Sequence, residues 1–129
     1  MNPSKFFLKL AIVFGTLAVV IGAFGAHGLK DLLLSNNRLD VYEKAVMYQF
    51  FHTFALLFTA FLMRSFSSKY LIWAARFFTI GILIFSGSLY ALAITNFTVL
   101  GAITPVGGVC FILGWIFLYL FVSSKAYNT

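Results

Sequence analysis

Two histidines and a small set of polar side chains are the residues of this chain whose types could do chemistry. His52 lies in an apolar run with Tyr48 and Gln49, and spacings of four and three residues place all three on one face of a helix. The other histidine, His27, stands just before the first loop. Imidazole, amide and hydroxyl groups in such a setting can join neighbouring helices, handle a proton or bind a small ligand.

Further polar residues fall at a similar predicted depth in the later apolar runs. Polar groups in hydrocarbon are costly unless they are satisfied, so we expect them to point at one another inside a bundle or into a cavity. Hydrogen bonding between helices is the simpler interpretation, and a small-ligand or proton-handling site is the alternative. The candidate polar cluster consists of His27, Tyr48, Gln49, His52, Thr53, Ser86, Ser88, Tyr90 and Thr104.

A metal or haem site is disfavoured by the depth and number of ligands. His27 is three residues from Lys30 and His52 is eight from Lys44. Their depths should therefore differ by roughly 8 Å at about 1.5 Å per residue. Asp31 is better placed to orient His27 than to complete a metal site. No Ser-His-Asp arrangement, glycine-rich phosphate loop or H-E-x-x-H motif occurs, so we expect no enzyme activity, metal or cofactor.

The composition places the chain in a membrane. Of its 129 residues, 62% are hydrophobic and 9% are charged, so the outer surface must also be apolar, and lipid tolerates such a surface. The net charge of +6 comes from basic residues that flank apolar runs, which indicates membrane topology and not nucleic-acid binding. The single cysteine, Cys110, excludes an intramolecular disulfide.

Four apolar runs are long enough to cross a bilayer. Residues 77–124 contain no charge, and as one helix these 48 residues would be about 72 Å long, so they must form two spans with a break near residues 95–98. Pro105 falls in the first turns of the last helix, and Asp40 could cap the second with Glu43 at its third position. We expect one domain over residues 1–129, an all-α integral membrane four-helix bundle with transmembrane helices at 8–28, 43–63, 71–94 and 99–122.

Small residues predict where these helices pack closely. Ala18, Gly22 and Ala26 recur every four residues in the first span. The basic start and the small residues of this span also fit a cleavable signal peptide, but a discarded segment would need no such stripe, so we keep the span. The predicted packing residues are Ala18, Gly22, Ala26, Gly101, Gly107 and Gly108.

The basic residues also predict the orientation. Six lie on the side of the N-terminus and three on the other side. By the positive-inside rule we expect an integral protein of a bacterial-type cell (inner) membrane with both termini in the cytoplasm.

Four short motifs together resemble those of a known family. They are Gly22-Ala-Phe-Gly-Ala-His27-Gly-Leu29, Tyr48-Gln49 with His52, Phe85-Ser-Gly-Ser-Leu-Tyr90, and Leu100-Gly-Ala-Ile-Thr-Pro105-Val-Gly-Gly108 with Gly114-Trp115. The chain resembles, over nearly its whole length, the small membrane proteins called domain of unknown function 423, to which eukaryotic transmembrane protein 256 is similar. The resemblance implies four transmembrane helices and a retained first span. It brings no assigned biochemical activity and offers no catalytic residues to carry over.

We therefore expect a non-enzymatic structural, partner-binding or regulatory membrane module. Its expected partners are the lipid bilayer and either further copies of itself or another membrane protein, with no nucleic acid. The alternative is a transporter or channel-like element, or a protein that binds a small ligand or lipid, using the polar cluster around His27 and His52. A transport route must connect both sides, and the halves of the spans nearest the termini carry no matching polar groups, which favours the module.

Overall fold

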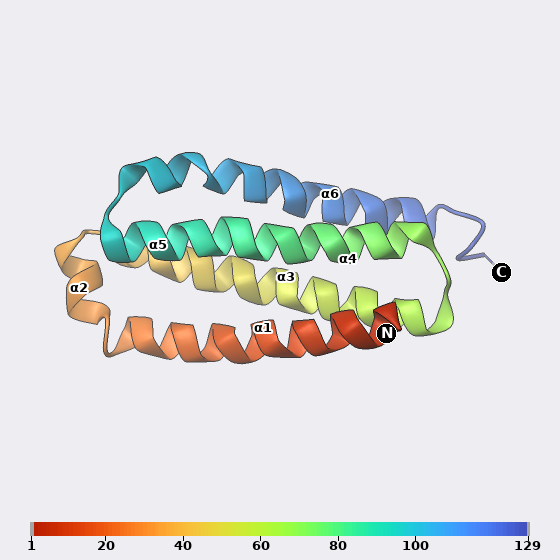
Figure 1. Ribbon diagram of the computed structural model, residues 1–129, viewed down its shortest axis with the longest axis horizontal. Helices are drawn as coiled ribbons and strands as arrows, with labels where there is room; N and C mark the ends of the chain where they lie inside the picture. Colours follow the sequence, from red (N-terminus) through yellow and green to blue (C-terminus); the bar gives the residue numbers. More distant parts are fainter. Residues whose placement is uncertain (1, 129) are drawn as a thin grey trace.

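Four long helices run alternately up and down in the computed structural model, which describes residues 2–128 (Figure 1). The first is α1 (Pro3–Ala26), and the short α2 (Lys30–Ser35) connects it to the second, α3 (Leu39–Ser65). The third consists of α4 (Lys69–Gly81), the π-helical turn η1 (Ile82–Ser86) and α5 (Gly87–Thr95). The fourth consists of the 3₁₀ turn η2 (Thr98–Ala102) and α6 (Thr104–Val122). Each of the four is long and apolar enough to cross a membrane, which confirms the all-α membrane fold class.

Most helix ends lie near the expected bounds, and two beginnings differ. α1 begins at Pro3 and α3 begins at Leu39, so both extend several residues beyond the apolar run, as helices do when their ends enter the headgroup region. Because α3 begins one residue before Asp40, the capping prediction for that aspartate is wrong: Arg38 occupies the N-cap, and no side chain caps this helix.

The break between the third and fourth helices lies at Asn96. This residue adopts a left-handed conformation (φ 57°, ψ 23°), which asparagine tolerates better than most residues, and it ends α5. Pro105 lies in the first turn of α6, where its missing N–H removes no helical hydrogen bond.

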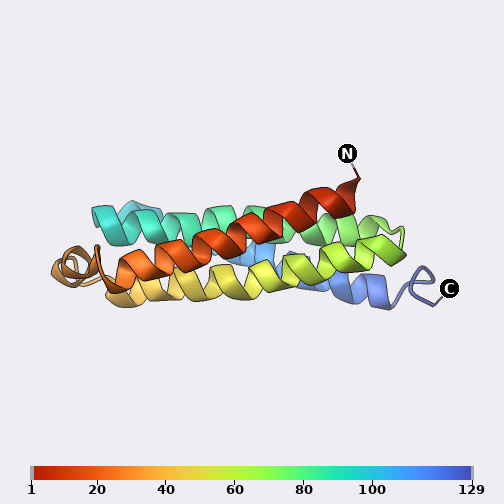
Figure 2. The ribbon, with the colours of Figure 1, turned by 90° about the horizontal axis from the view of Figure 1, so that it is seen from below.

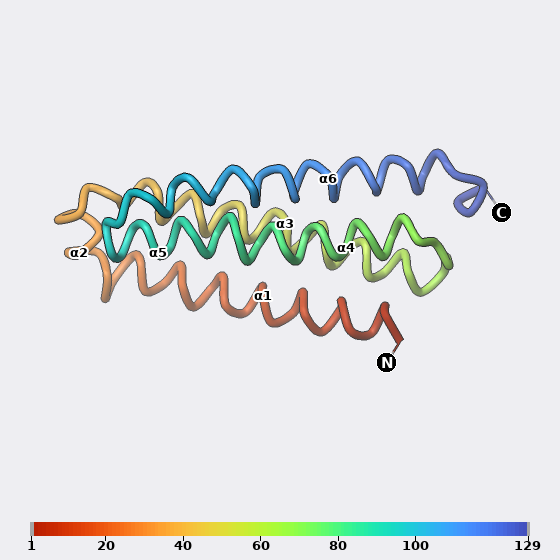
Figure 3. Tube along the Cα trace, turned by 45° about the horizontal axis from the view of Figure 1, so that its top comes forward, coloured from red at the N-terminus to blue at the C-terminus, as the bar shows by residue number. Residues whose placement is uncertain are grey.

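The third helix is central to the arrangement. α1 packs chiefly on α3, α6 packs chiefly on α4 and η1, and α3 packs along the whole of the third helix. The tube in Figure 3 shows α1 and α6 on the two outer sides of this assembly, and Figure 2 shows α1 running obliquely across it. Both termini and the α3–α4 connection lie at one end, and α2 and the α5–α6 connection lie at the other (Figure 1).

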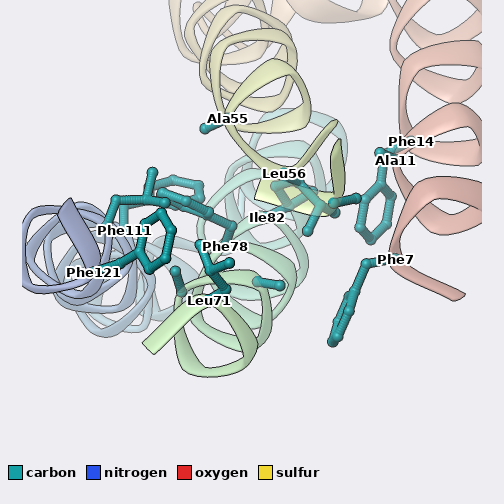
Figure 4. Packing of buried hydrophobic residues seen from close by; sticks show 14 residues of the cluster. Phe7, Ala11, Phe14, Ala55, Leu56, Leu71, Phe78, Ile82, Phe111 and Phe121 are labelled. Carbon is teal, nitrogen blue, oxygen red and sulfur yellow. The ribbon is translucent and has the colours of Figure 1, made fainter. Parts of the chain in front are cut away.

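Aromatic and aliphatic side chains fill the half of the bundle nearest the termini. Leu56, Phe78 and Phe121 are fully buried there, and Phe7 and Phe14 extend the same cluster toward α1 (Figure 4). The outward faces are apolar as well, as Phe54 (61% exposed) and Ile112 (60% exposed) illustrate. A protein surrounded by lipid needs an apolar exterior as well as an apolar interior.

The segment around α2 is fixed to the end of α5. Asn36 Nδ2 lies 3.0 Å from the carbonyl oxygens of Ala93 and Ile94, and Arg38 Nε donates to Asn96 Oδ1 at 3.0 Å. The last carbonyls of a helix lack partners within it, so these side chains satisfy groups that would otherwise need water. They anchor the end of the bundle that lies away from the termini.

Candidate functional site

Gln49 joins three helices from the middle of the bundle. Its Nε2 donates to the Phe14 carbonyl oxygen on α1 at 2.8 Å, and its Oε1 accepts the Tyr90 hydroxyl of α5 at 2.7 Å. The side chain is 3% exposed. An amide can donate and accept at once, so one residue of α3 holds both neighbours.

Two serines of the third helix make similar contacts. Ser86, at the end of the π-helical turn η1, donates to the Ala45 carbonyl oxygen on α3 at 2.8 Å. The Ser88 hydroxyl lies 2.7 Å from that of Thr104, which begins α6. A π-helical turn contains one extra residue, so the side chains after it point in a different direction from those before it. The two serines therefore reach different neighbouring helices.

His52 connects α3 to α6. Its Nδ1 lies 2.8 Å from the Tyr48 carbonyl oxygen, and its Nε2 accepts the Trp115 indole N–H at 3.2 Å. A carbonyl oxygen only accepts, so these two contacts together require the neutral imidazole with its proton on Nδ1. The ring also stacks on Phe111, with centroids 3.5 Å apart and planes 11° from parallel. Both ring nitrogens are occupied.

An aromatic groove passes beside His52 on the outer surface. Its volume is about 390 Å³. The Tyr48 ring, 37% exposed, stacks on Phe85 at 4.5 Å and forms one of its walls. The groove is lined by Tyr48, His52, Phe85, Pro105, Gly108, Val109, Phe111, Ile112 and Trp115.

The expected single polar cluster is divided into separate contacts, and that part of the prediction is wrong. Gln49 and His52 lie about 60° apart around α3, at roughly 100° per residue, so they face different neighbouring helices. His27 is exposed at the end of α1, away from both, and none of the hydrogen bonds among the described residues involves its side chain. The Thr53 hydroxyl is buried without a hydrogen-bond partner.

The predicted small-residue surfaces lie at helix contacts in most cases. Ala18 is fully buried, and a Cβ at Gly22 would lie 3.3 Å from Val46. A Cβ at Gly107 would overlap the Phe85 backbone. A Cβ at Gly101 would lie 3.6 Å from the Leu92 side chain, and a Cβ at Gly108 would lie 3.9 Å from the Phe85 side chain, so both positions have more space. Ala26 is exposed.

Several close contacts were missed by the sequence reasoning. A Cβ at Gly25 would overlap the ring of Tyr42, and one at Gly114 would lie 2.5 Å from Phe78. The Tyr42 hydroxyl donates to the Ile21 carbonyl oxygen of α1. Gly25 is three residues from Gly22, so a stripe drawn with three-residue as well as four-residue steps would have included it; Tyr42 carries no comparable signal.

The titratable residues do not gather into a metal site. Among residues 2–128, no group of three or more histidine, cysteine, aspartate or glutamate side chains is close enough to hold a metal ion. Cys110 is a free, half-buried thiol on α6. Around the predicted polar residues, the structure has a set of helix-to-helix hydrogen bonds and the aromatic groove beside His52.

The family model for "Protein of unknown function (DUF423)" matches residues 21–108. The chain belongs to this family. The match covers His52, the serines of the third helix and Thr104, whereas Phe14 and Trp115, which bond to Gln49 and His52, lie outside it. It confirms the resemblance that the sequence motifs indicated.

Curated relatives extend this similarity over most of the chain. It is 46% identical over 116 residues to a UPF0382 membrane protein of Staphylococcus epidermidis, which covers 90% of this chain and 93% of the relative. It is 42% identical to the UPF0382 membrane protein YwdK of Bacillus subtilis, over 88% of this chain and 93% of the relative. No solved structure matches it significantly. The relatives are bacterial membrane proteins, and their names state no activity.

Proposed function

We propose that this protein is a non-enzymatic module of the bacterial cell membrane that stabilises or regulates membrane partners, including further copies of itself. One observation carries the proposal: most of the buried polar side chains hold helices together, and they do not converge on a common site. Gln49, Ser86 and His52 each make at least one side-chain hydrogen bond to a neighbouring helix. A bundle fixed in this way presents a stable apolar exterior to another membrane protein.

The half of the bundle nearest the termini supports the same proposal. Among the described residues, the buried polar side chains of that half are Ser4 and Thr59, and each donates to a backbone carbonyl. A transport route would need polar groups or a water-filled cavity continuing to this side. The packed phenylalanines there favour a module over a transporter.

The outer face of α3 is a suitable surface for a partner. It carries a row of phenylalanines with alternating spacings of three and four residues, which gives a continuous apolar ridge. Their side chains are 50–61% exposed. The ridge consists of Phe51, Phe54, Phe58 and Phe61.

Photo-crosslinking in intact cells tests this function. A photoreactive phenylalanine would replace one exposed residue at a time: Val19 on α1, Phe54 on α3 or Ile112 on α6. A module with partners should give a discrete heavier species after irradiation at one or more positions, and none without irradiation. A product of twice the mass would identify a second copy. The absence of a heavier species at all three positions would contradict the proposal.

The orientation is part of the proposal and has its own test. Single cysteines at Ser35 and Ser67 would be introduced into a Cys110→Ser background, since both serines are exposed and lie at opposite ends of the bundle. With both termini in the cytoplasm, a membrane-impermeant maleimide should label position 35 in spheroplasts. Position 67 should be labelled only after the membrane is opened. The reverse pattern would contradict the cytoplasmic termini.

A second candidate function has a specific observation in its favour. The aromatic groove of about 390 Å³ beside His52 is within the size range of small-ligand sites. Native mass spectrometry of the protein released from mild detergent would detect a retained small molecule. Loss of that mass in Ile112→Trp, which fills the groove from an exposed position, would favour ligand binding, and a bare polypeptide in the wild type would argue against it.

A further inference from the structure

The charges of this molecule are divided unevenly between its two ends. The end with α2 carries all three acidic residues and three basic ones, which sum to zero. The end with the termini carries the other six basic residues and no acid: Lys5, Lys9, Arg64, Lys69, Arg76 and Lys125. A surface of this kind attracts anionic lipid headgroups and disfavours headgroups that present an ammonium group.

Arg76 lies deeper in the membrane than most of these basic residues. It is seven residues into α4, about 10 Å along the helix. Its guanidinium lies 5.0 Å from the centroid of the Trp73 ring, and the three acidic side chains lie at the opposite end of the bundle. A guanidinium at this depth is stabilised by a cation–π contact on one side and lacks a nearby carboxylate to balance its charge.

A groove of about 440 Å³ opens beside Arg76, between the start of α1 and α4. Phe6 and Phe7 form its wall on α1, and Ile72 and Ile80 form its wall on α4. Ile80 lies deeper along α4 than Arg76, so the groove continues from the arginine toward the middle of the bilayer. It therefore combines one cation near the headgroup level with an apolar channel below it.

We propose that this groove binds one anionic phospholipid, with the phosphate on Arg76 and an acyl chain along Phe6, Phe7 and Ile80. A guanidinium can donate two parallel hydrogen bonds to a phosphate, which a lysine cannot do with the same geometry. A zwitterionic lipid has the same phosphate but would bring its ammonium group into a region of six positive charges. The site thus selects the anionic headgroup.

Tryptophan quenching by brominated lipids tests the proposal. The chain has two tryptophans, and a Trp115→Phe background leaves Trp73, the one beside Arg76. The protein would be reconstituted in vesicles of phosphatidylcholine with either phosphatidylglycerol or phosphatidylcholine brominated near the headgroup end of the chain. We expect stronger quenching by the brominated phosphatidylglycerol, with fluorescence normalised to unbrominated lipid for each variant.

Two matched substitutions separate the site from the overall charge. Arg76→Gln should weaken the preference for the anionic lipid by more than about fivefold, because it removes the charge-assisted hydrogen bonds to the phosphate in addition to the general effect of one basic residue at an anionic surface. Lys125→Gln removes the same charge from the same end but lies outside the groove, so it should weaken the preference by about fivefold at most. Equal quenching by both lipids in the Trp115→Phe background, or a preference lowered no more in Arg76→Gln than in Lys125→Gln, would overturn the proposal.

Native mass spectrometry gives a second readout that does not depend on fluorescence. Protein released from vesicles containing phosphatidylglycerol should retain one such lipid, and the adduct should be lost in Arg76→Gln and kept in Lys125→Gln. Arg76 is exposed, so its substitution should leave the helices folded, and circular dichroism would verify this. An adduct that survives in Arg76→Gln would also overturn the proposal.

Discussion

The indole N–H of Trp115 donates to Nε2 of His52 across 3.2 Å and connects α6 to α3. Elsewhere α6 packs chiefly on α4 and η1, so this contact reaches past the third helix. The same imidazole uses Nδ1 on the Tyr48 carbonyl oxygen of its own helix. His52 is thus a structural link between two helices that are not consecutive in the chain, and its ring nitrogens are already occupied beside the aromatic groove.

A double-mutant cycle on this pair should show a measurable coupling. His52→Leu and Trp115→Phe each remove the hydrogen bond, so the loss of unfolding free energy in the double variant should be smaller than the sum of the two single losses. Hydrogen bonds between membrane helices average about 0.6 kcal/mol, and we expect a coupling of that size. Unfolding in mixed detergent would measure it, and strictly additive losses would show that the contact does not stabilise the fold.

Gln49→Leu should destabilise the bundle more than either of those single changes. The substitution leaves the half-buried Tyr90 hydroxyl without its acceptor and leaves the Phe14 carbonyl oxygen of α1 without the donor that Gln49 supplies. An unsatisfied buried polar group costs about 1–3 kcal/mol, and the same unfolding measurement would detect it. Adding Tyr90→Phe to Gln49→Leu should restore part of the loss. A Gln49→Leu protein as stable as the wild type would contradict this assignment.

The sequence predicted the spans and their break because length and charge determine both. Residues 77–124 are too long for one span, and Asn96 ends α5 inside the expected break. Spacing also placed Gln49 and His52 on one side of α3, but it could not say which helix each would meet, since this depends on how neighbouring helices are rotated. His27 was misassigned for a related reason: similar depth does not imply that two side chains face each other.

The glycine contacts were predictable only in part. A repeat of small residues shows that a close approach occurs, whereas the large residue that fills the space comes from another segment. Gly25 and Gly114 meet Tyr42 and Phe78 respectively, and each ring belongs to a different span from its glycine. Tertiary packing therefore decides which glycines are essential.

Gly107→Ala should be destabilising because a Cβ there would overlap the backbone of Phe85 in the third helix. Backbone cannot move aside as a flexible side chain can, so α6 must shift, at an expected cost of about 1–3 kcal/mol. Gly87→Ala is the matched control, since no atom lies within 4 Å of the added Cβ, and better helix propensity should leave its stability unchanged or slightly raised. Thermal unfolding of both variants would check this, and equal melting temperatures would refute it.

Thr53→Val should leave stability unchanged or raise it by up to about 1 kcal/mol, because it removes a buried hydroxyl that has no hydrogen-bond partner. Thr59→Val is the appropriate comparison, since Thr59 is on the same helix and is fully buried, but its hydroxyl donates to the Ala55 carbonyl oxygen at 2.7 Å. That variant should lose about 0.5–1.5 kcal/mol. Measuring the unfolding free energies of the two variants would test this difference. A larger loss at Thr53 than at Thr59 would mean that the Thr53 hydroxyl has a partner in the membrane and is a candidate contact for a bound molecule.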